Sequence, residues 1–152
     1  MVLTELLSPE RIRVPLQALD KEALLDELLG ILEGSDQVED LRAVSRAVRE
    51  REEVLSTGIG NGVAIPHGKS PAAASLVLAA GVTAEPVDFE ALDGEPVRLV
   101  FLLVGPEAAA GQHVKVLSRI SRLLRRESFR NRLVDAASAE EFYDILAEAE
   151  AS

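Results

Sequence analysis

The sequence predicts an α/β protein with the helices packed on both faces of a mixed β-sheet, a three-layer α/β/α sandwich. Its 152 residues fit one domain of ordinary size, which we expect to span residues 1–152. Apolar residues make up 47% of the chain, enough to build a core. Periodic segments follow one another as a strand, two helices, several strands and then helices, and this order favours the layered class.

The first third of the chain predicts one strand and two helices. Residues 11–15 alternate between charged and apolar side chains, which is typical of a short strand. Asp20 is a good N-cap for a helix whose leucines form a wide apolar face, and Gly34 fits the end of that helix. A second helix with a narrower apolar stripe is expected over residues 38–53.

A glycine-rich segment at residues 56–62 interrupts this pattern. Three glycines stand there at alternate positions, namely Gly58, Gly60 and Gly62. This spacing disfavours a helix or a central strand, so we expect a tight loop whose backbone N–H groups are free to point in one direction. Residues 63–65 then predict a short strand that leads to Pro66 and His67.

The second half of the chain predicts two long strands and three helices. Residues 75–84 and 97–104 are nearly continuous apolar runs, as in strands that are buried on both faces. Helices are expected over residues 112–126, over residues 129–134 and from Ser138 onward. Glu141 follows Ser138 by three residues, which is the spacing of a capping box.

Composition and charge exclude several classes of function. The chain has no cysteine, which excludes disulfides and thiolate metal sites. No apolar run approaches the ~18 residues of a membrane span, and the first residues lack the pattern of a signal peptide. The net charge of −10 disfavours non-specific binding to nucleic acid. We therefore expect a cytoplasmic protein with no nucleic-acid partner and no membrane insertion.

His67 is the first candidate for chemistry. It follows Pro66, which fixes the backbone, and precedes Gly68, which allows another molecule to approach closely. Imidazole has a pKa of about 6.5 and is a competent nucleophile near neutral pH. A transferred phosphoryl group would explain the position, because it needs donors aimed at its oxygens. The competing interpretation is an ordinary surface or hydrogen-bonded histidine.

His113 and Arg51 are the second and third candidates, and each has an ordinary alternative. His113 lies near the start of the helix at residues 112–126, either as a histidine at the edge of the core or as a second imidazole beside His67. Arg51 comes just before the glycine-rich segment, either as a surface residue or as a cation that pairs with a bound phosphoryl group. Backbone N–H groups of the glycine-rich segment could add further donors.

Basic side chains are concentrated in residues 115–132, although the chain as a whole is acidic. They are Lys115, Arg119, Arg122, Arg125, Arg126, Arg130 and Arg132. A solvated helix face explains them, and a surface for an anionic partner is the alternative. The stacking aromatics of single-stranded nucleic-acid sites are missing, with Phe129 alone nearby.

Residues 51–69, with the sequence REEVLSTGIGNGVAIPHGK, resemble the signature of the type-2 enzyme IIA family of the phosphotransferase system. That family contains the fructose, mannitol and nitrogen-regulatory phosphocarriers. Residues 86–97 look like the middle strands and turn of the family, and residues 111–117 look like its second-histidine helix. The resemblance therefore covers nearly the whole chain and implies a three-layer α/β/α fold.

The resemblance implies specific site residues. His67 would accept a phosphoryl group from HPr or an HPr-like carrier, His113 would hold that group, and Arg51 would neutralise it. A loop would shape the phosphoryl pocket, and its residues are Ser56, Thr57, Gly58, Gly60, Asn61 and Gly62. The resemblance implies no metal and no other cofactor, because transfer runs in line between two imidazoles.

Three hypotheses of function remain open from the sequence. The first is a phosphocarrier that passes the group to a IIB component for sugar transport. The second is a nitrogen-regulatory type of binding module, in which phosphorylation of His67 controls protein partners without sugar transport. Residues 66–69 lean toward this branch, whereas residues 111–113 look more like the fructose branch. The third is a degenerate member of the family that only binds anions.

Overall fold

The computed structural model describes residues 2–151 of the chain. The strands are β1 (Ile12–Leu16), β2 (Gly58–Gly60), β3 (Val63–Ala64), β4 (His67–Lys69), β5 (Val77–Val87) and β6 (Val97–Gly105). The α-helices are α1 (Lys21–Ile31), α2 (Leu41–Val54), α3 (Ala110–Leu123), α4 (Glu127–Val134) and α5 (Ala139–Ala151). Three short 3-10 turns are η1 (Leu3–Glu5), η2 (Pro9–Arg11) and η3 (Glu107–Ala109).

The strands form one mixed sheet in the order β1-β5-β6-β3-β2. β1 runs parallel to β5, β5 runs antiparallel to β6, and β3 and β4 both run parallel to β6. Val63 pairs with Leu99 of β6, and His67 pairs with Leu103 further along the same strand. β3 and β4 are therefore two segments of one interrupted strand, separated by Ile65 and Pro66.

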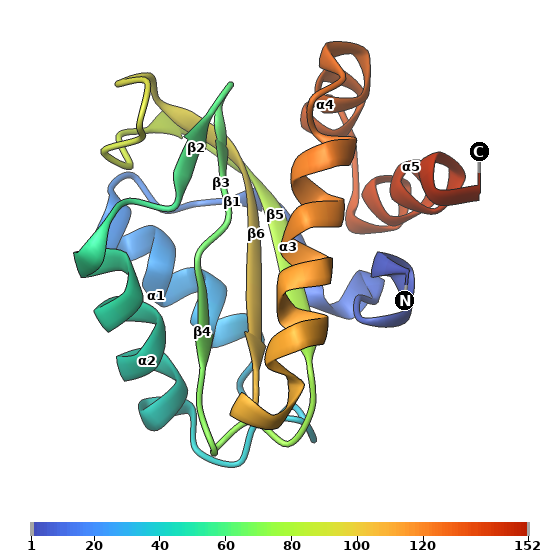
Figure 1. Ribbon diagram of the computed structural model, residues 1–152. Helices are drawn as coiled ribbons and strands as arrows, with labels where there is room; N and C mark the ends of the chain where they lie inside the picture. Colours follow the sequence, from blue (N-terminus) through green and yellow to red (C-terminus); the bar gives the residue numbers. More distant parts are fainter. Residues whose placement is uncertain (1, 152) are drawn as a thin grey trace.

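The helices cover both faces of this sheet, as the sequence predicts (Figure 1). α1 and α2 lie on one face, and α3, α4 and α5 lie on the other together with the N-terminal segment. Side chains alternate along the buried strands: Leu78 and Ala80 of β5 join the core under α3–α5, whereas Ala79 joins the core under α1 and α2. The three-layer prediction is confirmed.

The N-terminal boundaries of α1 and α2 follow their capping residues. The Asp20 side chain accepts a hydrogen bond of 2.8 Å from the Ala23 N–H and starts α1, as predicted. The second helix was predicted to start at residue 38 but begins at Leu41, because Asp40 is its N-cap. Val38 instead forms an isolated β-bridge with Ala73, so a backbone pairing that the local pattern does not encode sets this boundary.

The glycine-rich segment is a β-hairpin rather than the loop that the sequence predicts. β2 pairs antiparallel with β3 at the sheet edge, and Asn61 and Gly62 make the turn with φ angles of 58° and 75°. Alternate glycines disfavour a central strand, but an edge strand needs few side-chain contacts and tolerates them. The prediction of a loop was therefore wrong for residues 58–60.

Three of the seven basic side chains in residues 115–132 have acceptors within the protein. Arg119 lies 2.6 Å from a Glu150 oxygen, and Arg132 lies 3.2 Å from Glu148. Arg130 donates to the Leu124 carbonyl at 2.7 Å and so closes the end of α3. These three side chains thus have partners within the protein, and the choice between a solvated helix face and a surface for an anionic partner stays a prediction. Within residues 2–151, no helix combines the length and the apolar character that a membrane crossing requires.

Glu150 ties three parts of the chain together. Its carboxylate accepts hydrogen bonds from the Leu3 N–H at 2.8 Å, the Thr4 N–H at 3.0 Å and the Arg119 side chain at 2.6 Å. Burial acts to raise the pKa of Glu150, but the bonds from Leu3, Arg119 and Thr4 outweigh it and hold the pKa below its usual value. The carboxylate therefore fastens α5 to the N-terminal segment and to α3.

We expect Glu150→Gln to destabilise the protein by about 1–3 kcal/mol at pH 7, because two backbone donors and Arg119 lose a charged acceptor. The folded pKa lies below the unfolded one, so the charge stabilises the fold above the unfolded pKa of about 4.3 and less as the pH falls. Urea unfolding at pH 7 and pH 4 measures both, with Glu140→Gln as an exposed control. An equal loss at both pH values would contradict the assignment.

Candidate functional site

His67 stands at the point where the interrupted strand resumes. It is the first residue of β4 and half-buried, and its Nδ1 lies 2.9 Å from the Ile65 carbonyl oxygen. A carbonyl oxygen can only accept, so we assign the proton to Nδ1. The lone pair then resides on Nε2, which makes Nε2 the nucleophilic atom. The sequence leaves this choice of nitrogen open.

Gly68 brings helix α2 against the strand beside His67. A Cβ at Gly68 would lie 2.9 Å from the Val48 backbone nitrogen and 3.1 Å from its Cα, closer than a side chain can approach. Only glycine therefore lets α2 pack directly on β4. This contact places the C-terminal end of α2, which carries Arg51 and Glu52, at the edge of the site.

The ring of His113, from α3, lies beside the ring of His67. The ring centroids lie 5.5 Å apart with the planes inclined by 60°. His113 is only 1% exposed, and within residues 2–151 neither of its ring nitrogens has a hydrogen-bond partner. Burying two polar atoms without hydrogen bonds costs folding free energy. Their presence in this fold therefore indicates a functional role for His113. The structure thus brings together the two histidines that the sequence singles out.

Both imidazoles are neutral at physiological pH. Burial lowers the pKa of His67, with a smaller opposing effect from the Ile65 hydrogen bond and a further lowering by the Arg51 charge. Burial, then the charges of His67 and Lys69, lower the pKa of His113 to about 4. A neutral His67 keeps its lone pair, and a neutral His113 offers one N–H donor.

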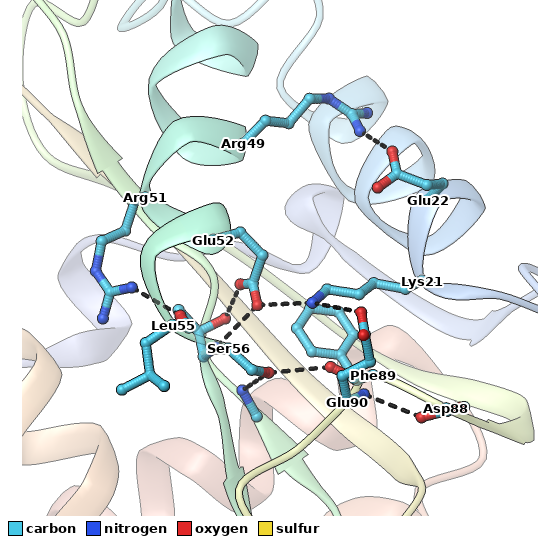
Figure 2. A network of polar contacts seen from close by, with 12 residues as sticks. Lys21, Glu22, Arg49, Arg51, Glu52, Leu55, Ser56, Asp88, Phe89 and Glu90 are labelled. Atoms are coloured by element: carbon cyan, nitrogen blue, oxygen red, sulfur yellow. Dashed lines mark hydrogen bonds and ion pairs between the residues drawn. The ribbon is translucent and has the colours of Figure 1, made fainter.

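Arg51 lies at the end of α2, with its guanidinium directed to the helix end (Figure 2). Its Nη1 donates to the Leu55 carbonyl at 2.8 Å. In the part of the chain that the structure describes, its Nε and Nη2 have no hydrogen-bond partner. The charge of Arg51 lowers the pKa of His67, so the guanidinium acts on the imidazole electrostatically.

Contacts from the segment at residues 88–93 hold the glycine hairpin in place. Ser56 Oγ donates to the Phe89 carbonyl at 3.0 Å and accepts from the Gly58 N–H at 3.1 Å. The Asn61 N–H donates to the Asp93 carboxylate at 3.1 Å. These two N–H groups are thus engaged, which corrects the expectation that the segment leaves its N–H groups free. That the hairpin shapes a phosphoryl pocket stays a prediction.

Glu52 is a polar residue of the site that the sequence analysis missed. It is 7% exposed and contacts Lys21 and Thr57, and it lies among the side chains shown in Figure 2. A signal was available: Glu52 follows Val48 by four residues and therefore falls on the buried stripe of α2. A carboxylate at such a position needs partners inside the protein.

The described residues offer no ready metal centre. Within residues 2–151, no group of three or more His, Cys, Asp or Glu side chains is placed to hold a metal ion. The polar groups that act on His67 are instead a second imidazole, the cations Arg51 and Lys69, and the Glu52 carboxylate. Cations and N–H donors outnumber the one carboxylate, and such a set suits an anion.

The mixed three-layer fold thus brings two imidazoles face to face, with the charges of Arg51 and Lys69 nearby. The model of the family described as "Phosphoenolpyruvate-dependent sugar phosphotransferase system, EIIA 2" matches residues 5–149. The chain belongs to this family, which confirms the resemblance noted from residues 51–69.

Relatives carry both transport and regulatory names. The chain is 40% identical over 148 residues to a nitrogen regulatory protein of Bradyrhizobium diazoefficiens, covering 97% of this chain and 95% of that one. It is 38% identical over 146 residues to the fructose-specific EIIABC component of Bacillus subtilis, covering 96% of this chain but only 23% of that relative's length. The nitrogen regulatory protein IIA-Ntr of Neisseria meningitidis superposes with a TM-score of 0.88 at 36% identity, covering 94% of this chain and 97% of that chain.

Proposed function

We propose that this protein is a phosphohistidine carrier that accepts a phosphoryl group on Nε2 of His67. The donor is the phosphohistidine of HPr or an HPr-like carrier. The bond between phosphorus and the donor nitrogen breaks as the bond to Nε2 forms, and the donor imidazole leaves with the electron pair. The main support is the tether from Nδ1 to Ile65 at 2.9 Å, which leaves Nε2 as the free nitrogen.

The tether also suits the product of this step. Phosphorylation of Nε2 on a ring that keeps the Nδ1 proton creates positive charge on the imidazole. The Ile65 carbonyl oxygen accepts that proton in a hydrogen bond and stabilises the charged ring. No proton therefore has to leave His67 for the group to be accepted.

His113 and Arg51 take roles at the transferred group. The single N–H of neutral His113 donates to a phosphoryl oxygen, which gives a partner to a ring that otherwise has none among residues 2–151. Arg51 offers Nε and Nη2 to another oxygen while Nη1 stays on the Leu55 carbonyl. Both contacts strengthen as charge shifts onto the group.

Exposed apolar side chains next to the site residues provide a surface for protein partners. Val54 is 79% exposed and Leu55 56% exposed at the end of α2, Ile59 of the hairpin is 42% exposed, and Val114 is 62% exposed beside His113. Apolar clusters of this kind mark protein interaction sites. The mannitol enzyme IIA of Escherichia coli, which shares the fold, has been solved with phosphorylated enzyme IIB, and we propose a IIB component as the onward acceptor here.

A nitrogen-regulatory role is the second candidate function. In this case the phosphorylation state of His67 selects protein partners, and no sugar is transported. The 40% identity to a nitrogen regulatory protein favours it. Both candidates share the same chemistry at His67 and a cytoplasmic location, so they differ only in what reads the phosphorylated site.

The test is the intact mass of the purified protein after incubation with phosphoenolpyruvate, enzyme I and HPr. The proposal expects a gain of one phosphoryl group that is lost in acid. A nitrogen-branch enzyme I and carrier form the second arm of the experiment. No gain with either donor would overturn the proposal, and a gain in only one arm would identify the branch.

The lowered pKa of both histidines predicts their titration. By ¹H–¹⁵N NMR, we expect the midpoint of His67 below 6.5 and that of His113 near 4. Arg51→Gln removes a charge that disfavours protonation and should raise the midpoint of His67. The exposed Arg46→Gln on the same helix is the control. A midpoint of His67 above 6.5 in the unmodified protein would contradict the neutral nucleophile.

A further inference from the structure

An ion pair between Lys21 and Glu52, near the C-terminal end of α2, begins a chain of polar contacts that ends at His67. The Lys21 Nζ lies 3.0 Å from Glu52 Oε2, 3.4 Å from Glu90, and 4.8 Å from the centre of the Phe89 ring (Figure 2). The Lys21 side chain is 17% exposed and the Glu52 side chain 6% exposed. The carboxylate is thus held in one place by a cation that is itself packed against an aromatic ring.

Both oxygens of the Glu52 carboxylate accept hydrogen bonds from Thr57. Oε2 accepts the Thr57 backbone N–H at 2.9 Å, and Oε1 accepts the Thr57 hydroxyl. Two bonds to one residue fix both its peptide plane and its side chain. Thr57 is itself buried, so water does not compete for these bonds.

The contacts continue along the backbone from Thr57 to the imidazole. The Thr57 carbonyl accepts the Ile65 N–H at 2.9 Å. The Ile65 carbonyl then accepts the Nδ1 proton of His67, also at 2.9 Å. Each end of Ile65 is therefore fixed by one member of the chain, and its side chain is 3% exposed in the core under α3–α5.

We propose that Glu52, held by Lys21, is a positioning residue for phosphoryl transfer, which sets the orientation and the tautomer of His67 through Thr57 and Ile65. This inference rests on the proposed function of His67 and names residues that nothing in the family match assigns. Glu52 acts through other residues and does not touch the transferred group. An ion pair that only stabilised the fold could end at Lys21 and Glu52. Here the Glu52 carboxylate also binds the Thr57 backbone, which connects it to the His67 imidazole.

The decisive variant is Glu52→Gln, with Glu53→Gln as the control one residue away on the exposed side of α2. The amide keeps the shape but replaces one acceptor oxygen by a donor, which cannot accept from Thr57 or Lys21. We expect ¹⁵N NMR of the imidazole to show His67 as the Nδ1–H tautomer in the unmodified protein and as a mixture in Glu52→Gln. Single-turnover uptake from the phosphorylated carrier should slow about 10- to 100-fold, by analogy with the loss seen when an outer partner that orients a metal-bound histidine is removed.

Two further variants guard against a simple loss of folding. Thr57→Val removes only the hydroxyl donor, so His67 should become a mixture of tautomers and phosphate uptake should slow. Thr57→Ser keeps a hydroxyl, so the single Nδ1–H tautomer and the uptake rate should be recovered. The carrier concentration at half-maximal rate should stay unchanged throughout, because the docking surface is intact. A single Nδ1–H tautomer in folded Glu52→Gln and Thr57→Val would overturn the proposal. If the unmodified protein took up no phosphate, the proposed function would fail, yet the tautomer measurement would still decide whether Glu52 positions His67.

Discussion

His67→Ala protein is expected to gain no acid-labile phosphate from any phosphorylated carrier. Nε2 of His67 carries a free lone pair, and the side chain that bears it is only half-buried. The other histidine, His113, is 1% exposed, so a carrier cannot reach its ring directly in this fold. Alanine removes the nucleophile completely, and the rate should fall below detection rather than decline by a modest factor.

The measurement is intact mass over time, with the thermal midpoint recorded for each variant. His67 is half-buried, so its truncation should leave a folded protein with a similar far-UV spectrum. If His67→Ala protein still gained phosphate, another residue would have to be the nucleophile. Peptide mapping at neutral pH would then identify that residue, with His113 as the first one to examine.

His113→Leu is expected to slow phosphoryl transfer about 100- to 1,000-fold, since it removes the donor that we propose for a phosphoryl oxygen. The same change should raise the free energy of unfolding by about 1–3 kcal/mol, because two buried nitrogens without partners among residues 2–151 disappear. Leucine is close to histidine in volume and favours a helix, so α3 should accept it. Activity and stability would therefore change in opposite directions.

Urea unfolding and single-turnover transfer, measured on the same preparations, test both halves of this prediction. His113→Gln keeps an N–H donor and should retain more activity than leucine while gaining less stability. A marked loss of stability in His113→Leu would show that the histidine has a structural partner. Unchanged transfer in folded His113→Leu would remove it from the site.

Periodicity predicted the layers of the fold because each element repeats a local pattern over several residues. The apolar stripe of α2 is long enough to show its period, and the continuous apolar runs of β5 and β6 have the length of buried strands. β4 was missed, since three residues cannot establish alternation and its pairing with β6 is a distant contact. The strand at Gly58–Gly60 was also missed, because it too has only three residues and depends on a distant contact. The turn that follows it is held by Asp93, from another part of the chain.

The candidate site was predictable where one residue type carries the chemistry. The chain has only two histidines, which made His67 and His113 easy to single out, and the fold places them 5.5 Å apart. The choice of nitrogen on His67 was not predictable, because a backbone carbonyl decides it. Glu52 was overlooked because a glutamate in a charged helix resembles a surface residue until its position on the buried stripe is noticed.

The break between β3 and β4 has a consequence for the energetics of transfer. The backbone of His67 belongs to the sheet, where it pairs with Leu103 of β6. In the gap between the two strands, the Ile65 carbonyl points toward the His67 ring. A nucleophile mounted in this way has little reorganisation to undergo between its free and loaded states. In the proposed carrier, transfer can then run in either direction, and the free-energy difference between the two partners at their working concentrations sets the direction of net flow.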